Sequence, residues 1–133
     1  MKNINVVAAV IKKGDKILAT QRGYGEFKDG WEFPGGKIEA GELPAEALVR
    51  EIKEELNAQI KVDQELGSVE YDYPNFHLNM QFFLCSLVTE ELTLLEHEDM
   101  KWLTAATMDN VDWLPADVEI AQKVQKILQM ENA

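Results

Sequence analysis

The order of apolar patterns along the chain is the feature that most restricts its fold. β-Branched runs at 6–11 and 17–20 flank a turn-rich segment, which predicts a hairpin. Apolar residues recur at helical spacing over 44–56 and again over 118–130. Other apolar runs predict strands at 60–62, 66–73, 76–88 and 100–103. The order strands, helix, strands, helix favours an α/β (α+β) domain with helices packed on a mixed sheet.

Length and charge narrow the class of protein further. The chain has 133 residues, room for one hydrophobic core, so residues 1–133 are expected to form a single domain. Its net charge of −11 repels polyanions and argues against binding to duplex nucleic acid or to a membrane surface. No apolar run approaches the roughly 20 residues of a membrane span, and no signal segment is recognisable. A cytoplasmic location is therefore expected.

The helix predicted at 44–56 carries a cluster of acids. Glu51, Glu54 and Glu55 fall within an arc of about 100° on a helical wheel, at the margin of the apolar stripe. Like charges at this spacing repel one another, and Arg50 projects in another direction, where it is not placed to neutralise all three. A divalent cation is better placed, because Mg²⁺ takes oxygen ligands from carboxylates and phosphates. The alternative is a surface helix whose glutamates are simply solvated.

The segment before this helix suits a ligand site. Glycines and prolines between 23 and 36 exclude any long regular element. Gly35 and Gly36 let the backbone approach a ligand closely, a main-chain carbonyl there can coordinate a metal, and Lys37 offers an ammonium group for phosphate. We therefore expect the loop and the acidic helix to act together.

These residues also carry a family resemblance. Gly36, Glu42 and the run Arg50-Glu51-Ile52-Lys53-Glu54-Glu55-Leu56 stand at the spacing of the Nudix box, so the chain resembles the Nudix hydrolases. Asn57 stands where the box usually has glycine, and asparagine also tolerates a left-handed helix end. The segments 31–37 and 114–117 are similar to those of the MutT branch, which includes bacterial CTP pyrophosphohydrolases and 8-oxo-dGTP diphosphatases.

The resemblance implies a fold and an activity. The implied fold is an α/β/α sandwich around a mixed sheet. The implied reaction is Mg²⁺-dependent hydrolysis of a nucleoside triphosphate to monophosphate and pyrophosphate, with Mn²⁺ as a substitute metal. CTP, dCTP or oxidised purine nucleotides such as 8-oxo-dGTP are the expected substrates, in housecleaning of the nucleotide pool. Hydrolysis of ADP-ribose or another nucleoside diphosphate sugar, and a non-catalytic nucleotide-binding module, stay open as alternatives, as do a monomer and a homodimer.

The resemblance also implies metal ligands and catalytic groups. The implied ligands are the main-chain carbonyl of Gly35 and the carboxylates of Glu51, Glu54, Glu55 and Glu96. Glu98 and Asp99 compete with Glu96 for the last position. The three box glutamates are also the implied catalytic residues, and either Glu51 or Glu54 would orient or deprotonate the attacking water. Gly36, Glu42 and Arg50 match box positions that hold the loop and the helix together.

Substrate contacts are implied elsewhere in the chain. Arg22 and Lys37 match positions that contact phosphate, and Phe33 is a candidate wall of the base pocket, with core packing as its alternative. Asp117 matches the position that reads the base edge. A carboxylate accepts hydrogen bonds only, which favours donors such as the exocyclic amine of cytosine or the N1 and N2 hydrogens of guanine. The alternative is that Asp117 caps the last helix. The two histidines, His77 and His97, lack the spacing of metal ligands and are predicted to be structural or exposed.

Overall fold

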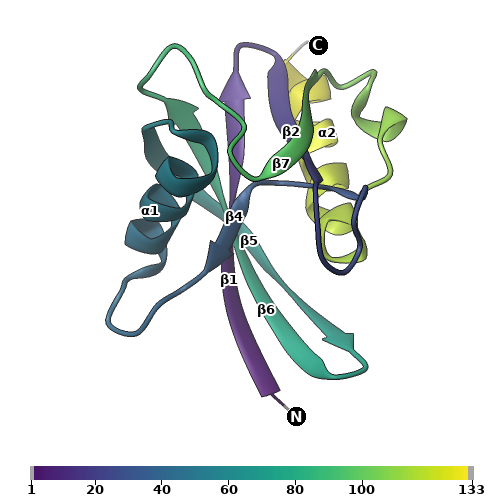
Figure 1. Cartoon of the computed structure of the whole chain (residues 1–133). Coiled ribbons are helices and arrows are strands. Elements are labelled where there is room, and N and C mark those ends of the chain that lie inside the picture. Colours follow the sequence, from purple (N-terminus) through teal and green to yellow (C-terminus); the bar gives the residue numbers. More distant parts are fainter. Residues whose placement is uncertain (1, 132–133) are drawn as a thin grey trace.

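A mixed sheet between two helices organises the chain, as a computed structural model describes it for residues 2–131 (Figure 1). The strands are β1 (Lys2–Lys13), β2 (Lys16–Arg22), β3 (Trp31–Glu32), β4 (Gly35–Lys37), β5 (Ile60–Tyr73), β6 (Phe76–Leu87) and β7 (His97–Leu103). The helices are α1 (Pro44–Leu56) and α2 (Val118–Glu131), with short 3-10 turns at Met108–Asn110 and Pro115–Asp117. Met1, Asn132 and Ala133, which the single-domain prediction includes, lie outside the described residues.

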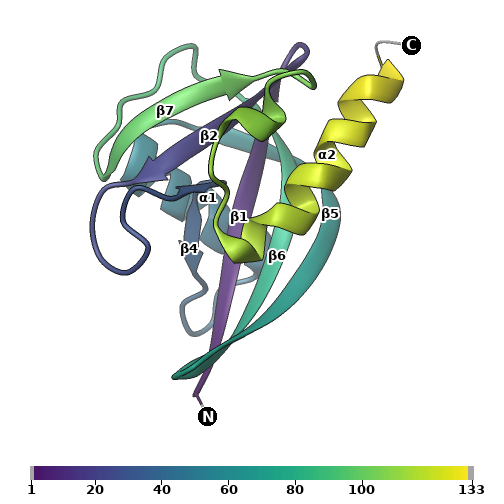
Figure 2. The ribbon, with the colours of Figure 1, turned by 90° about the vertical axis from the view of Figure 1, so that its right-hand side faces the viewer.

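Strand β1 is the centre of the sheet. The strand order is β3-β2-β1-β6-β5, with β4 also paired to β1 and β7 to β2. Strand β1 runs parallel to β6 and antiparallel to β2 and β4. Helix α1 covers one face of the sheet and α2 the other, and Figure 2 shows α2 in front of the sheet. The predicted α/β/α sandwich is confirmed.

The continuous apolar run of β1 follows from this position. Successive side chains of a strand point to opposite faces. Val7, Ala9 and Ile11 therefore pack in the cluster under α1, whereas Ala8 and Val10 pack in the cluster under α2. Because both faces of this strand are buried, its sequence does not alternate between apolar and polar residues.

Helix α1 has defined ends. At its start, the Leu43 N–H donates a hydrogen bond of 2.9 Å to the Glu46 carboxylate. At its end, Asn57 adopts the left-handed conformation, with φ of 49°, and its N–H donates to the Lys53 carbonyl at 3.1 Å. The expectation that Asn57 replaces the usual glycine at a left-handed helix end is confirmed.

Several strand boundaries differ from the sequence expectation, and β1 and β2 both extend beyond the runs expected at 6–11 and 17–20. Segments 60–62 and 66–73 form one strand, β5, whose pairing with β6 shifts register on both sides of Gln64 and Glu65. The loop expected at 23–36 contains the short strands β3 and most of β4. Strand β7 begins at His97 rather than near residue 100, because it pairs with β2 as far as Arg22.

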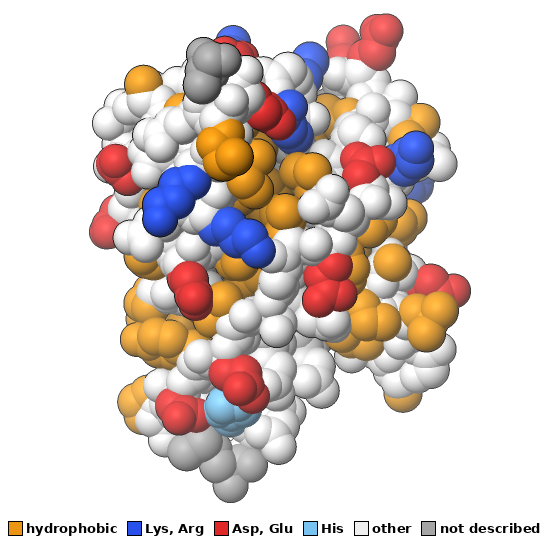
Figure 3. Space-filling view, turned by 180° about the vertical axis from the view of Figure 1, so that it is seen from behind, with side chains coloured by type: hydrophobic (Ala, Val, Ile, Leu, Met, Phe, Trp, Pro, Cys, Tyr) orange, Lys and Arg blue, Asp and Glu red, His pale blue; other side chains and the backbone are white. Residues whose placement is uncertain are grey.

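The surface carries charges of both signs. On the face in Figure 3, Lys and Arg side chains are scattered among acidic and apolar ones rather than gathered in one patch. Within residues 2–131, no helix is long and apolar enough to cross a membrane.

Candidate active site

Two adjoining cavities lie beside β4. The first, which we call the carboxylate cavity, has a volume of about 390 Å³ and is lined by Glu55, Glu96 and His97 among others. The second, which we call the Asp117 cavity, has a volume of about 170 Å³ and is lined by Phe33, Tyr73 and Asp117 among others. The two cavities share the wall residues Arg22, Glu32, Gly35, Gly36 and Lys37.

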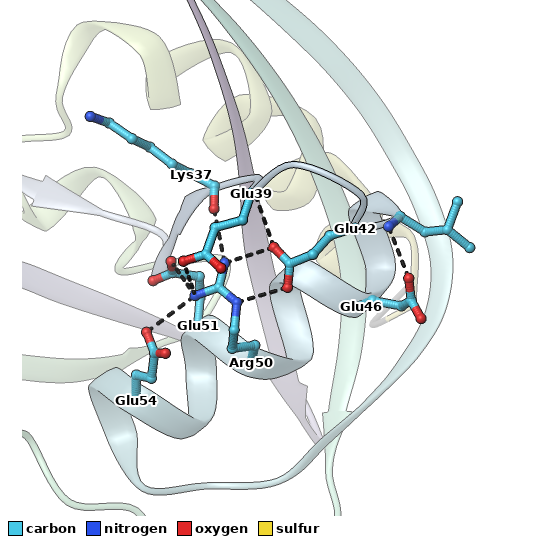
Figure 4. A network of polar contacts seen from close by, with 8 residues as sticks. Lys37, Glu39, Glu42, Glu46, Arg50, Glu51 and Glu54 are labelled. Atoms are coloured by element: carbon cyan, nitrogen blue, oxygen red, sulfur yellow. Dashed lines mark hydrogen bonds and ion pairs between the residues drawn. The ribbon is translucent and has the colours of Figure 1, made fainter.

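Arg50 ties the loop to α1 (Figure 4). Its Nε and Nη2 atoms donate to the two carboxylate oxygens of Glu42 at 2.8 and 2.9 Å, and Nη2 also donates to the Lys37 carbonyl at 3.1 Å. The Arg50 guanidinium lowers the pKa of the Glu42 carboxyl. Bidentate pairs of this kind fix orientation as well as adding energy, so Arg50 and Glu42 hold the loop against the helix.

The same guanidinium reaches two of the box acids, contrary to the sequence expectation. Arg50 Nη1 lies 2.9 Å from Glu51 Oε1 and 3.2 Å from Glu54 Oε2. The prediction that Arg50 projects away from the acids was wrong, because a helical wheel places the Cβ atom and ignores how far a long side chain bends back over the surface. Despite this contact, burial raises the pKa of Glu51, and the charges of Glu54 and Glu96 add to the shift.

Glu55 lies in the buried face of α1 rather than at its margin. That face consists of Ala47, Leu48, Ile52, Glu55 and Leu56. Val49, one of the apolar residues that recur at helical spacing in this helix, is 37% exposed, so the buried arc is rotated towards the acids. Burial, together with the charges of Glu51, Glu96 and Glu32, raises the pKa of Glu55 to about 9. Its Oε2 atom is buried without a hydrogen-bond partner in the described part of the chain.

An orphaned, buried carboxylate oxygen of this kind fits a cation. Metal ligands compete with protons, and a nearby cation reverses the pKa shift that burial causes. As they stand, the His, Cys, Asp and Glu side chains of residues 2–131 form no group of three that could hold a metal ion. At Glu51 and Glu54 the Arg50 guanidinium takes carboxylate oxygens. The donor types nonetheless suit a hard cation, which prefers carboxylate and carbonyl oxygens.

Of the three candidates for the additional carboxylate, Glu96 lies with the box acids. It lines the carboxylate cavity beside Glu55, and its charge raises the pKa of that residue. Glu98 instead lies 3.5 Å from Lys28 Nζ, and an Asp99 carboxylate oxygen accepts the Met100 N–H at 2.8 Å. We keep Glu96 as the proposed ligand.

Gly35 and Gly36 are required by close packing. A Cβ atom on Gly35 would overlap the Val7 carbonyl of β1, and one on Gly36 would overlap the Glu51 carboxylate. The absence of side chains therefore lets β4 pair with β1 while Glu51 packs against it. This explains the glycines of the box without any need for an unusual backbone conformation.

Asp117 lies at the closed end of the second cavity. It is 2% exposed, and its Oδ1 accepts the Phe33 N–H at 3.2 Å across the fold. That bond joins Asp117 to the segment between β3 and β4, and within residues 2–131 Asp117 accepts no hydrogen bond from the first N–H groups of α2, as the capping alternative would require. Burial, and secondarily the charge of Glu32, raises the pKa of Asp117 well above its usual range.

Arg22 stands between the two cavities. Its guanidinium forms a bidentate pair with Glu32 at 2.6 and 3.1 Å and also donates to the Glu26 carbonyl at 3.0 Å. Lys37, which is exposed, lines both cavities. The two cations expected to contact phosphate therefore lie on the wall that the cavities share.

Phe33 contributes mainly to the core. It is 2% exposed, and its ring lies 4.6 Å from that of Trp113 and edge-on to Phe82 at 6.0 Å, measured between centroids. Its ring is thus packed on both sides, although the residue also lines the Asp117 cavity. The more accessible aromatic side chain of that cavity is Tyr73, which is half-buried.

Sequence reasoning missed three residues of the site. Glu32 pairs with Arg22, Tyr73 reaches the Asp117 cavity from the end of β5, and His97 lines the carboxylate cavity. His97 Nε2 lies 3.8 Å from Glu32 Oε2, and its Nδ1 is buried without a partner in the described residues. The proximity of His97 to Glu96 in the chain was a usable signal, whereas nothing local marks Tyr73.

Comparison with known proteins identifies the class. A model of the NUDIX domain matches residues 1–124. A protein named 8-oxo-dGTP diphosphatase from Proteus vulgaris is 37% identical over 94 residues, which cover 69% of this chain and 84% of the relative. A protein named CTP pyrophosphohydrolase from Escherichia coli is 32% identical over 123 residues, 92% of this chain and 91% of the relative. The solution structure of the E. coli ORF135 protein has a TM-score of 0.79 and 31% identity, covering 92% of this chain and 88% of that one.

The chain therefore belongs to the Nudix family. It is a hydrolase acting on phosphoric anhydride bonds, and the expected resemblance to the MutT branch is confirmed. Members of this family generally need a divalent metal ion, usually Mg²⁺.

Proposed function

We propose that this chain hydrolyses a nucleoside triphosphate to the monophosphate and pyrophosphate, with Mg²⁺ or, as a substitute, Mn²⁺, in the cytoplasm. The expected substrates are CTP, dCTP or oxidised purine nucleotides such as 8-oxo-dGTP. The observation that carries the proposal is the pair of adjoining cavities, one lined by Glu55 of the box together with Glu96, and the other by the buried Asp117. A phosphate chain suits the first cavity and a nucleobase the second.

Two sets of residues would bind the metal ion and the phosphate chain. The Gly35 carbonyl and the carboxylates of Glu51, Glu54, Glu55 and Glu96 would hold the metal. Bound there, a divalent cation neutralises charge on the phosphate chain and lowers the pKa of a water molecule. Arg22 and Lys37, on the wall between the cavities, add positive charge next to the phosphates.

A glutamate of the Nudix box would take the proton from the attacking water molecule. Glu51 or Glu54 would accept the proton of the water that attacks the β-phosphorus in line. The nucleoside monophosphate would leave, and the water oxygen would stay in the pyrophosphate. Glu55 is the less suitable base, because its carboxyl lies in the buried face of α1 and its unpartnered oxygen is assigned to the metal. This assignment leaves Glu55 as a ligand and one of the other two glutamates as base.

The test is a panel of nucleotides with Mg²⁺, followed by pyrophosphate release. The panel contains CTP, dCTP, 5-methyl-dCTP, 8-oxo-dGTP, dGTP and ATP, with ADP-ribose followed by monophosphate release. We expect at least one triphosphate to yield monophosphate and pyrophosphate. Cleavage of ADP-ribose alone would favour the nucleoside diphosphate sugar alternative, and no turnover at all would favour a nucleotide-binding module.

A further inference from the structure

The charge state of Asp117 decides how the second cavity recognises a base. Its carboxyl is nearly inaccessible, accepts one hydrogen bond, from the Phe33 N–H, and forms no ion pair with any residue in 2–131. An ionised carboxylate in such a place is costly unless a cation or several donors compensate it.

The groups that face Asp117 do not supply that compensation. Arg22 of β2 is the cation whose charge acts on Asp117, but it is committed to a bidentate pair with Glu32 of β3. Glu32 itself opposes ionisation of Asp117. Lys37 of β4 lines the cavity, but its side chain is exposed. Burial raises the pKa of Tyr73 on β5, and the charge of Asp117 adds to the shift, so the Tyr73 hydroxyl stays neutral.

We propose that Asp117 reads the base as a neutral carboxylic acid, with one oxygen accepting the Phe33 N–H and the other donating its hydrogen to the base. This inference rests on the proposed function, since it assigns the base to this cavity. It changes the chemistry of recognition, because a carboxylate only accepts hydrogen bonds whereas the neutral acid donates one.

The neutral acid changes which atoms of a base edge can pair with Asp117. It pairs with an edge that offers an acceptor next to a donor, as cytosine does with N3 and its exocyclic amine. An ionised Asp117 would repel N3 of cytosine and would instead favour the adjacent N1 and N2 hydrogens of guanine. Adenine offers the same pair with N1 and its exocyclic amine, and guanine offers it with O6 and N1–H, so the neutral acid accepts bases that an ionised Asp117 would repel.

Asparagine is the matched substitution for this test. In Asp117→Asn, the amide oxygen can accept the Phe33 N–H while the amide nitrogen donates to the base, which copies the neutral acid. The Asp117→Ala variant removes both contacts. We would measure dissociation constants of CMP and GMP by titration calorimetry at pH 7, since binding of these products needs no turnover.

We expect Asp117→Asn to bind CMP and GMP as the wild type does, and Asp117→Ala to weaken binding of the preferred nucleotide about tenfold through loss of the hydrogen bond. Loss of that binding in Asp117→Asn equal to the loss in Asp117→Ala would overturn the proposal. So would a wild-type preference for GMP that Asp117→Asn abolishes, as an ionised Asp117 requires.

A direct measurement separates this inference from the proposed function. In protein labelled with ¹³C at Asp carboxyl carbons, the signal missing from Asp117→Asn belongs to Asp117. At pH 7 we expect its chemical shift to be that of a neutral acid, and the shift of an ionised carboxylate would overturn the inference. Failure of the proposed function would appear separately, as absence of triphosphate turnover.

Discussion

Replacing Glu51 with Gln is expected to reduce kcat for the preferred triphosphate by about 10²- to 10⁴-fold, the usual contribution of a positioned acid or base. Gln preserves the volume of the side chain that packs against Gly36 and can still accept the Arg50 hydrogen bond. It removes the negative charge that a cation requires and the group that accepts a proton. Steady-state kinetics over a range of Mg²⁺ concentrations would measure the effect.

The matched control for Glu51→Gln is Glu46→Gln on the same helix. Glu46 accepts the Leu43 N–H, a bond that a Gln oxygen also makes, and it lies outside both cavities. We expect Glu46→Gln to keep wild-type turnover. Full Mg²⁺-dependent activity in both Glu51→Gln and Glu54→Gln would contradict the assignment of the base.

Replacing Glu55 with Gln is expected to abolish turnover and yet to stabilise the fold. Glu55 has a pKa of about 9 in the folded chain, against about 4.3 for an ordinary glutamate. Between these values the folded state holds a proton that the unfolded state releases, so stability falls as pH rises from about 4 to about 9. At pH 7 this penalty amounts to about 4 kcal/mol, which Gln removes.

Urea denaturation in a chelating buffer at pH 5, 7 and 9 would measure this effect. The gain in Glu55→Gln should grow from pH 5 to pH 9, because Gln does not titrate, and its stability should vary less with pH than that of the wild type. Glu119→Gln, which removes an exposed acid from α2, is the control and should change little. A Gln variant less stable than the wild type at pH 9 would show that Glu55 is readily ionised in the folded chain. On this account, Glu55 lowers the stability of the fold and is retained because it serves as a metal ligand.

Sequence patterns predicted those elements that depend on residues close together in the chain. The period of apolar residues and Pro44 predicted α1 over the bounds that it has, and the β-branched run of β1 predicted a buried strand. Segment 60–73 was expected as two strands, because polar residues around Gln64 interrupt the apolar pattern. In the structure those residues are where the register with β6 shifts, an effect of long-range pairing.

The sequence motif predicted which residues form the candidate site, but not how deeply each side chain is buried or which groups it contacts. The spacing of Glu51 and Glu55 placed both acids on one helix face, but the buried position of Glu55 depends on how α1 packs on the sheet. Arg50 was misplaced because the direction of a Cβ atom does not fix where a guanidinium ends. Tyr73 and Asp117 lie far apart in the chain and line one cavity only because β5 extends along β6. Such distant pairings leave no local signal.

Hydrolysis of CTP in ¹⁸O-labelled water, followed by phosphorus NMR, tests the central claim most directly. With Mg²⁺ present, the account predicts unlabelled CMP and pyrophosphate that carries the label, as attack on the β-phosphorus requires. Label in CMP would place the attack on the α-phosphorus, and release of CDP with orthophosphate would place it on the γ-phosphorus. Either of these results would contradict the account.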